Sequence, residues 1–226
     1  MASQAASKGD VLQRIGGIGL LAGAILTAVG NLLVPRPDDP TVLAGYIKVW
    51  TAEPDRTRLG FFLILVGLWA LIAGFVAVYR SLTGPAAIAW ARMGAYGVVG
   101  GTAVLSVALA LGIAGTKLSE GGAPVMAATT AAAAATDSVF GVSIIGYWSA
   151  LTLLGIGLSV GTKYPRWTGW LLVIGGAVAV LTGGVLRVFG GNSESTELVF
   201  GAAALLTSVV EFVLGVLITR REMKAM

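Results

Sequence analysis

The stretch 198-LVFGAAALLTSVVEFVLGVLI-218 decides the fold class, because it is 21 residues of almost unbroken apolar sequence. A helix of about 20 apolar residues crosses the ~30 Å hydrocarbon core of a bilayer. Glu211 is the only ionisable residue in the stretch. A carboxylate at that depth is costly and rarely faces lipid, so it needs an inward-facing partner, a water-filled cavity or a proton. The stretch therefore predicts a transmembrane helix with one exceptional position.

The composition extends this assignment to the whole chain. Of its 226 residues, 56% are hydrophobic and 12% are charged, whereas soluble domains carry about 25% charged residues. Six apolar segments predict an all-α polytopic bundle that forms a single transmembrane domain, residues 1–226. The predicted spans cover residues of about 11–34, 58–82, 85–116, 138–162, 165–188 and 196–219.

Two connecting segments are long enough to hold structure of their own. Residues 41–53 place apolar side chains at helical spacing, which predicts a short helix lying at the membrane interface in the first outer loop. Residues 124–137 are rich in alanine, the best helix former. That segment is either a separate short helix or an N-terminal extension of the fourth span.

Charge predicts the orientation. With the N-terminus inside, the cytoplasmic segments hold nine basic residues against two acids, and the opposite segments hold six against eight. An excess of Lys and Arg marks the cytoplasmic side, so both termini should be cytoplasmic. The aromatic residues expected near that interface are Tyr79, Trp90, Tyr164, Trp167 and Trp170. Glycines at one-turn spacing, such as Gly19/Gly23 and Gly94/Gly97/Gly101, predict close helix packing.

The chain has no cysteine and no histidine, which excludes several kinds of site. A disulfide framework, a thiolate nucleophile, a Cys/His zinc site and imidazole-ligated haem are all ruled out. Serines within the spans have no histidine to activate them, and no glycine-rich phosphate loop stands between a strand and a helix. We therefore expect no catalytic residue, no metal and no cofactor. The basic pI of 9.6 reflects helix-end residues that meet anionic lipid rather than nucleic-acid binding.

Arg92 is the predicted partner of Glu211. Counted from the cytoplasmic helix ends, Arg92 lies roughly 10 Å deep in the third span and Glu211 roughly 12 Å deep in the last one. A guanidinium can hold a carboxylate through two hydrogen bonds. The structural interpretation is a buried charge pair that clasps the two helices together. The functional interpretation is a site at which Glu211 binds a proton or cation under the control of Arg92.

A second set of polar residues lies near the outer helix ends. Asn31, Asp137 and Arg187 form this predicted outer-face polar cluster. Arg187 could extend to the interface, since only a few residues separate it from the loop at 190–195. The sharper hypothesis is that Arg187 pairs with Asp137.

Four features recur in an order that covers nearly the whole chain: Arg14 with Gly17, the arginine at Arg92, the motif 164-YPRW-167 and the carboxylate at Glu211. In these features the sequence resembles a family of uncharacterised six-helix bacterial integral membrane proteins, a domain of unknown function. The resemblance implies a compact bundle in the bacterial plasma membrane and brings no activity.

We expect a non-enzymatic membrane protein, an accessory or structural subunit that packs in a homo-oligomer or a larger membrane complex. Its partners would be membrane lipids and other membrane subunits, with no nucleic acid. The alternative is a small transporter or channel for a proton, a cation or a small apolar molecule that uses Arg92 and Glu211.

Overall fold

The structure is a computed structural model that describes residues 2–37, 39, 42–191 and 193–224, and in these residues the fold is all-α. Six helical segments in this part of the chain are long and apolar enough to cross a membrane, which confirms the predicted fold class. They are α1 (Ala2–Leu33), α3 (Pro54–Ser81), α4 (Pro85–Ser119), α5 (Met126–Val160), α6 (Arg166–Ala179) continued to α7 (Leu186–Val188), and α8 (Glu194–Lys224). The predicted interfacial helix is present as α2 (Leu43–Ala52).

Several helix boundaries differ from the prediction. The first helix begins at Ala2 instead of residue 11, because a helix can continue past the membrane into polar sequence. The Ala-rich segment is not separate: after a 3₁₀ turn at Ala123–Val125 it runs without a break into α5. Between α6 and α7 the chain forms a wider, π-helical stretch, Val180–Val185. Such a stretch changes the direction in which the residues after it point.

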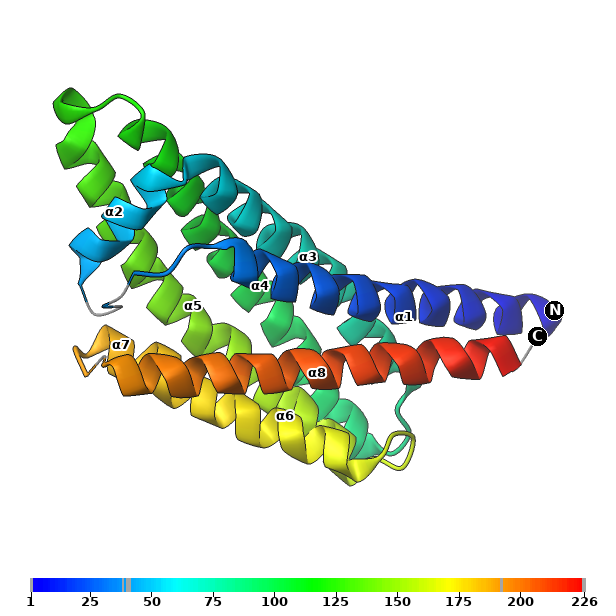
Figure 1. Ribbon diagram of the computed structural model, residues 1–226. Coiled ribbons are helices and arrows are strands. Elements are labelled where there is room, and N and C mark those ends of the chain that lie inside the picture. The colour runs from blue at the N-terminus through cyan, green and yellow to red at the C-terminus, as the bar shows by residue number, and fades with distance from the viewer. Residues whose placement is uncertain (1, 38, 40–41, 192, 225–226) are drawn as a thin grey trace.

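The six spans form a closed ring in which each one packs mainly against two neighbours. The order around the ring is α1, α3, α4, α5, α6 with α7, α8 and back to α1. Figure 1 shows α1 and α8 in front, with α4 and α5 behind them. Fully buried side chains from opposite sides, such as Leu20 of α1 and Leu151 of α5, belong to one continuous core. The interior of the ring is therefore filled by side chains.

Two rows of glycines bring α1 and α3 together along their whole contact. The glycines recur every seven residues in each helix and meet in antiparallel order: Gly16 with Gly74, Gly23 with Gly67 and Gly30 with Gly60. A Cβ atom on Gly67 would lie 2.9 Å from the carbonyl oxygen of Gly23, so only glycine fits there. Helices in lipid gain contact area through such small residues.

The predicted glycines of the third span also pack closely. Gly94, Gly97 and Gly101 of α4 all face α5, and a Cβ on Gly94 would lie 2.5 Å from the backbone nitrogen of Leu154. This confirms the expectation of small-residue packing. Bulky substituents in either row would push two backbones apart.

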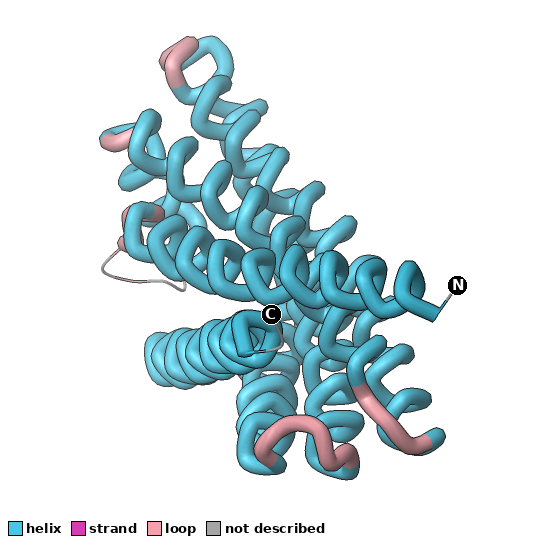
Figure 2. The backbone as a smooth tube through the Cα atoms, turned by 90° about the vertical axis from the view of Figure 1, so that its right-hand side faces the viewer, coloured by secondary structure: helices cyan, strands magenta, loops and turns pink. Residues whose placement is uncertain are grey.

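The loops gather at the two ends of the bundle, as Figure 2 shows. The α3–α4 and α5–α6 loops, the start of α1 and the end of α8 lie at one end, which we call the termini end (Figure 1). Ser81 and Tyr164 share a hydrogen bond of 2.8 Å there and tie the two loops together. The opposite end, called the Arg187 end, is covered by α2, which packs against α3, α4 and α5. The ring of Trp50 in α2 packs edge-on against the ring of Phe61 in α3, and the two ring centres are 5.4 Å apart.

Candidate functional site

The structure does not bring Arg92 and Glu211 together. The Arg92 side chain is exposed on the outside of α4, whereas Glu211 of α8 is 3% exposed. The buried residues of α4 nearest to Arg92 are Ala91, Gly94 and Ala95, and Ala91 and Gly94 contact α5. Arg92 follows Ala91 directly and is therefore turned about 100° away from that contact face. The predicted clasp is absent, and α4 is not a neighbour of α8 in the ring.

Glu211 lies where α8 passes from one neighbour to the other. One turn before it, Thr207 contacts Gly175 of α6, and one turn after it, Gly215 packs on Leu21 of α1. Among the described residues, no ion pair and no hydrogen bond includes the Glu211 carboxyl. An isolated charge in this setting would be very unfavourable. The residue therefore has no structural partner that would explain its presence.

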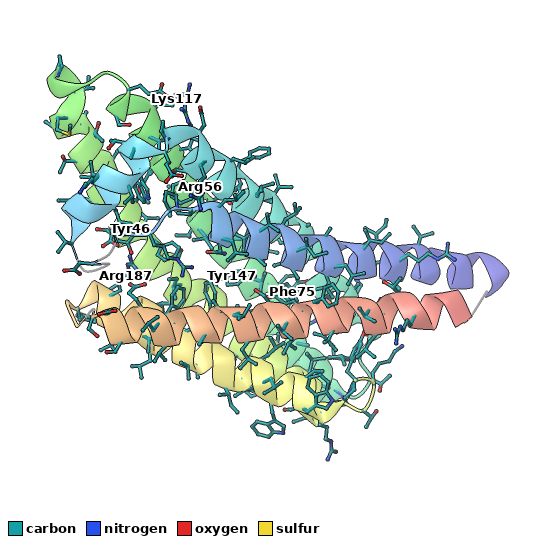
Figure 3. The ribbon with its side chains drawn as sticks, viewed as in Figure 1. Tyr46, Arg56, Phe75, Lys117, Tyr147 and Arg187 are labelled. Carbon is teal, nitrogen blue, oxygen red and sulfur yellow. The ribbon has the colours of Figure 1, made fainter. Side chains whose placement is uncertain are left out.

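Tyr147 of α5 is an ionisable residue on which the charge of Glu211 acts, although their helices are not neighbours in the ring. Its side chain is 2% exposed and lies close enough to Glu211 for an electrostatic interaction. Its backbone rests on Gly101 of α4, and α5 is not one of the two spans that flank α8. The two side chains therefore approach each other through the ring interior. Figure 3 shows Arg187, Tyr147 and Phe75 in that order from the Arg187 end toward the termini end.

Two further polar groups lie at the level of Tyr147. Trp148 follows Tyr147 in α5, and Thr102 follows Gly101, the residue of α4 on which Tyr147 packs. The hydroxyl of Thr102, next to Gly101, and the indole N–H of Trp148 are buried without a hydrogen-bond partner in the described part of the chain. Buried donors of this kind cost free energy unless something binds them. The level of Tyr147 is thus one part of the described core with unused hydrogen-bonding capacity; the indole N–H of Trp50 near the Arg187 end is another.

Arg187 is the centre of a polar network at the other end. Its guanidinium donates to Asp137 at 2.8 Å from Nε and to Glu197 at 2.7 Å from Nη1. The guanidinium carbon also lies 5.1 Å from the ring centre of Phe140, a cation–π contact. The Arg187 side chain is 9% exposed, against 47% for Asp137 and 18% for Glu197. The network joins α5, α7 and α8 through one buried cation.

Tyr46 extends this network to α2. The Tyr46 hydroxyl lies close enough to Arg187 to interact with its guanidinium, and burial together with the negative charge of Glu197 raises the pKa of Tyr46. Figure 3 shows Tyr46 and Arg187 close together at that end. Because α2 packs against α3, α4 and α5, this interaction links α2 to α7 at the Arg187 end.

Of the predicted outer-face cluster, Asp137 and Arg187 meet and Asn31 stays apart. The amide of Asn31 donates to the carbonyl oxygen of Thr27, within its own helix. Sequence reasoning missed Glu197 and Tyr46. Glu197 had a signal: a turn at Gly190, whose φ is +77°, returns the chain toward Arg187 within ten residues. Tyr46 had none, since its place depends on how α2 docks.

The arrangement offers ionisable chemistry but no metal centre. Within the described residues, no group of three carboxylates, histidines or cysteines lies together. A shallow groove between α6 and α8 is lined by apolar residues such as Ile174, Val178 and Leu206, and it offers no polar contact. The chemistry that remains is proton binding at Glu211 and charge pairing at Arg187.

Comparisons with protein-family models, curated proteins and solved structures gave no match for this chain. The resemblance to the six-helix family therefore has no family match behind it. What stands is its coarser implication, a multi-pass membrane protein with six candidate spans.

Proposed function

We propose that this protein is a non-enzymatic transporter of the bacterial plasma membrane that moves protons, alone or with a small solute, and that Glu211 binds the proton. The observation that carries the proposal is the buried Glu211 carboxyl, 3% exposed and without an ion pair among the described residues. An ionisable residue inside a membrane bundle marks a proton or ion path more often than a structural contact.

The chemistry of the surroundings favours a proton over a metal cation. Calcium or magnesium needs about six oxygen ligands, and Glu211 is the only carboxylate among residues 198–218. The remaining way to relieve the cost of the charge is a proton on the carboxyl. Arg92, which the sequence suggested as a regulator, is outside the bundle and has no part in this proposal.

The filled interior of the ring supports transport rather than a permanently open channel. A transporter must separate its binding residue from one side of the membrane at a time. The Arg187 network holds α2 over the ring, between the binding residue and that side. Breaking one buried guanidinium network would release several elements together. The charge pattern of the loops favours cytoplasmic termini, which makes the Arg187 end the external one.

Proton uptake into vesicles tests the proposal. The purified protein is reconstituted with a pH-sensitive dye inside the vesicles, and a potassium gradient with valinomycin drives protons inward. Wild type should acidify the lumen faster than protein-free vesicles, and Glu211→Gln should fall to their rate. Glu120→Gln is the control, because it makes the same chemical change at an exposed residue near the Arg187 end. A wild-type rate equal to that of protein-free vesicles, or full activity in Glu211→Gln, rejects the proposal.

An accessory subunit is the second candidate, and one observation favours it. Gly100 on the exposed side of α4 has no atom within 4 Å of where a Cβ would be, so another helix could approach closely there. If the protein is such a subunit, it should copurify with itself or a partner in mild detergent, and Gly100→Ile should release it. A single unpartnered copy in that detergent argues against this role.

A further inference from the structure

Two arginines without an acidic partner lie on the outer side of the α3–α4 hairpin. Arg80 is in the last turn of α3, and Arg92 is seven residues after the start of α4; both are exposed. Neither takes part in an ion pair with any residue that the structure describes. The sequence from Arg56 to Ser119 contains no aspartate or glutamate. Two neighbouring cations repel each other unless an anion lies between them.

Two tyrosines complete the group. The rings of Tyr79 and Tyr96 lie 6.3 Å apart across the hairpin. The Tyr79 hydroxyl interacts with the Arg80 guanidinium and with Tyr96, and Arg92 acts on it electrostatically. These four side chains, Tyr79, Arg80, Arg92 and Tyr96, form what we call the arginine–tyrosine cluster. It offers guanidinium and phenol donors on one exposed surface.

The contact between the tyrosines fixes the level of the cluster. Arg92 is one turn before Tyr96 and therefore lies closer to the α3–α4 loop than the tyrosine pair does. Toward the bilayer centre the same surface becomes apolar. Trp69 crosses from α3 to donate to Ser106 of α4 at 3.2 Å, and Val99, seven residues before Ser106 and so on the same face of α4, is exposed. From the helix ends toward the bilayer centre, this surface presents guanidinium groups, then phenols, then apolar side chains. A phospholipid has its charged headgroup and its acyl chains in the same order.

We propose that the arginine–tyrosine cluster binds the phosphate group of an anionic phospholipid in the leaflet at the termini end. Guanidinium groups hold phosphate oxygens through paired hydrogen bonds, and basic pockets at helix ends select anionic headgroups. Lys163 in the adjoining loop and Arg166 at the start of α6 add positive charge at the same end, where Ser81 and Tyr164 join the two loops. This site accounts for Arg92, which the clasp hypothesis had assigned to Glu211.

Lipid titration followed by native mass spectrometry tests the assignment. Delipidated wild-type protein in detergent should retain phosphatidylglycerol and not phosphatidylcholine. The double variant Arg80→Gln with Arg92→Gln should bind phosphatidylglycerol at least about tenfold more weakly, since two charge-assisted contacts are lost. The control pair is Lys48→Gln with Arg56→Gln, which removes the same charge from exposed residues near the Arg187 end. Equal affinity in the double variant and the control pair would overturn the proposal.

Two further arms separate the alternatives. Inorganic phosphate at millimolar concentration should leave the bound phosphatidylglycerol in place. Displacement of the lipid would mean that the cluster binds a soluble phosphate compound, and would overturn the proposal that it binds a phospholipid. Arg80→Lys with Arg92→Lys keeps the charge but loses the paired hydrogen bonds, so its affinity should fall between wild type and the Gln variant. That variant also reports on the cluster should the Gln variant fold poorly. An affinity no higher than that of the Gln variant would contradict a phosphate held by charge.

Discussion

Replacing Gly67 by alanine tests the glycine rows that hold α1 against α3. The added methyl carbon would lie 2.9 Å from the carbonyl oxygen of Gly23 and 2.8 Å from the backbone nitrogen of Thr27, where ordinary contact begins at 3.4 Å. Both are backbone atoms, so the two helices must separate by about half an ångström. Overpacking of this kind costs about 1–3 kcal/mol, and the better helix propensity of alanine returns up to about 1 kcal/mol. We expect a net loss of about 1–2 kcal/mol.

Thermal unfolding in detergent measures this loss, with the fluorescence of the six native tryptophans as the signal. At about 2–4 °C per kcal/mol for a chain of this size, Gly67→Ala should lower Tm by about 2–8 °C. Gly201→Ala is the matched control, because a Cβ there meets no atom within 4 Å. It should raise Tm by a few degrees at most, through helix propensity alone. If Gly67→Ala unfolds at or above the temperature of Gly201→Ala, the close contact of α1 and α3 is wrong.

Three other predictions follow from single contacts. Arg187→Gln should destabilise the protein by about 3 kcal/mol, because it leaves two carboxylates without their cation. Arg56→Gln, which breaks an exposed ion pair, should change stability by no more than about 1 kcal/mol, and thermal unfolding compares the two variants. Tyr164→Phe should cost about 1 kcal/mol by removing the hydrogen bond to Ser81, and Ser81→Ala combined with it should add little in a double-mutant cycle. Glu211→Gln should change stability by less than about 1 kcal/mol, since no ion pair is lost; a loss of about 3 kcal/mol or more would reveal a hidden partner.

The fold class could be predicted because the bilayer imposes it. Spans need about 20 apolar residues, and those stretches are visible in the sequence without any knowledge of packing. Helix ends were less accurate, as in α5, where the alanine-rich segment is too weakly hydrophobic to be read as part of a span. The glycine rows were readable in part. A spacing of seven in two segments is present in the sequence, but their antiparallel pairing depends on which helices are neighbours.

The Arg92–Glu211 pair failed for two physical reasons. Equal depth does not make two helices neighbours, and α4 is not next to α8 in the ring. Helical phase was also left out: small residues at Ala91, Gly94 and Ala95 mark the packed face of α4, and Arg92 is off that face. The Arg187–Asp137 contact needed only two residues near the same helix ends, which charge and position already suggested.

Infrared spectroscopy of the protein in lipid gives the most direct test of Glu211 as a proton-binding residue. A protonated carboxyl group absorbs through its carbonyl stretch, and a carboxylate lacks that band. At neutral pH the band should be present in wild type, disappear in Glu211→Gln and persist unchanged in Arg92→Gln. Absence of the band from wild type would mean that the carboxyl group is ionised, and a change on replacing Arg92 would mean that Arg92 acts on it. Either result would contradict the account.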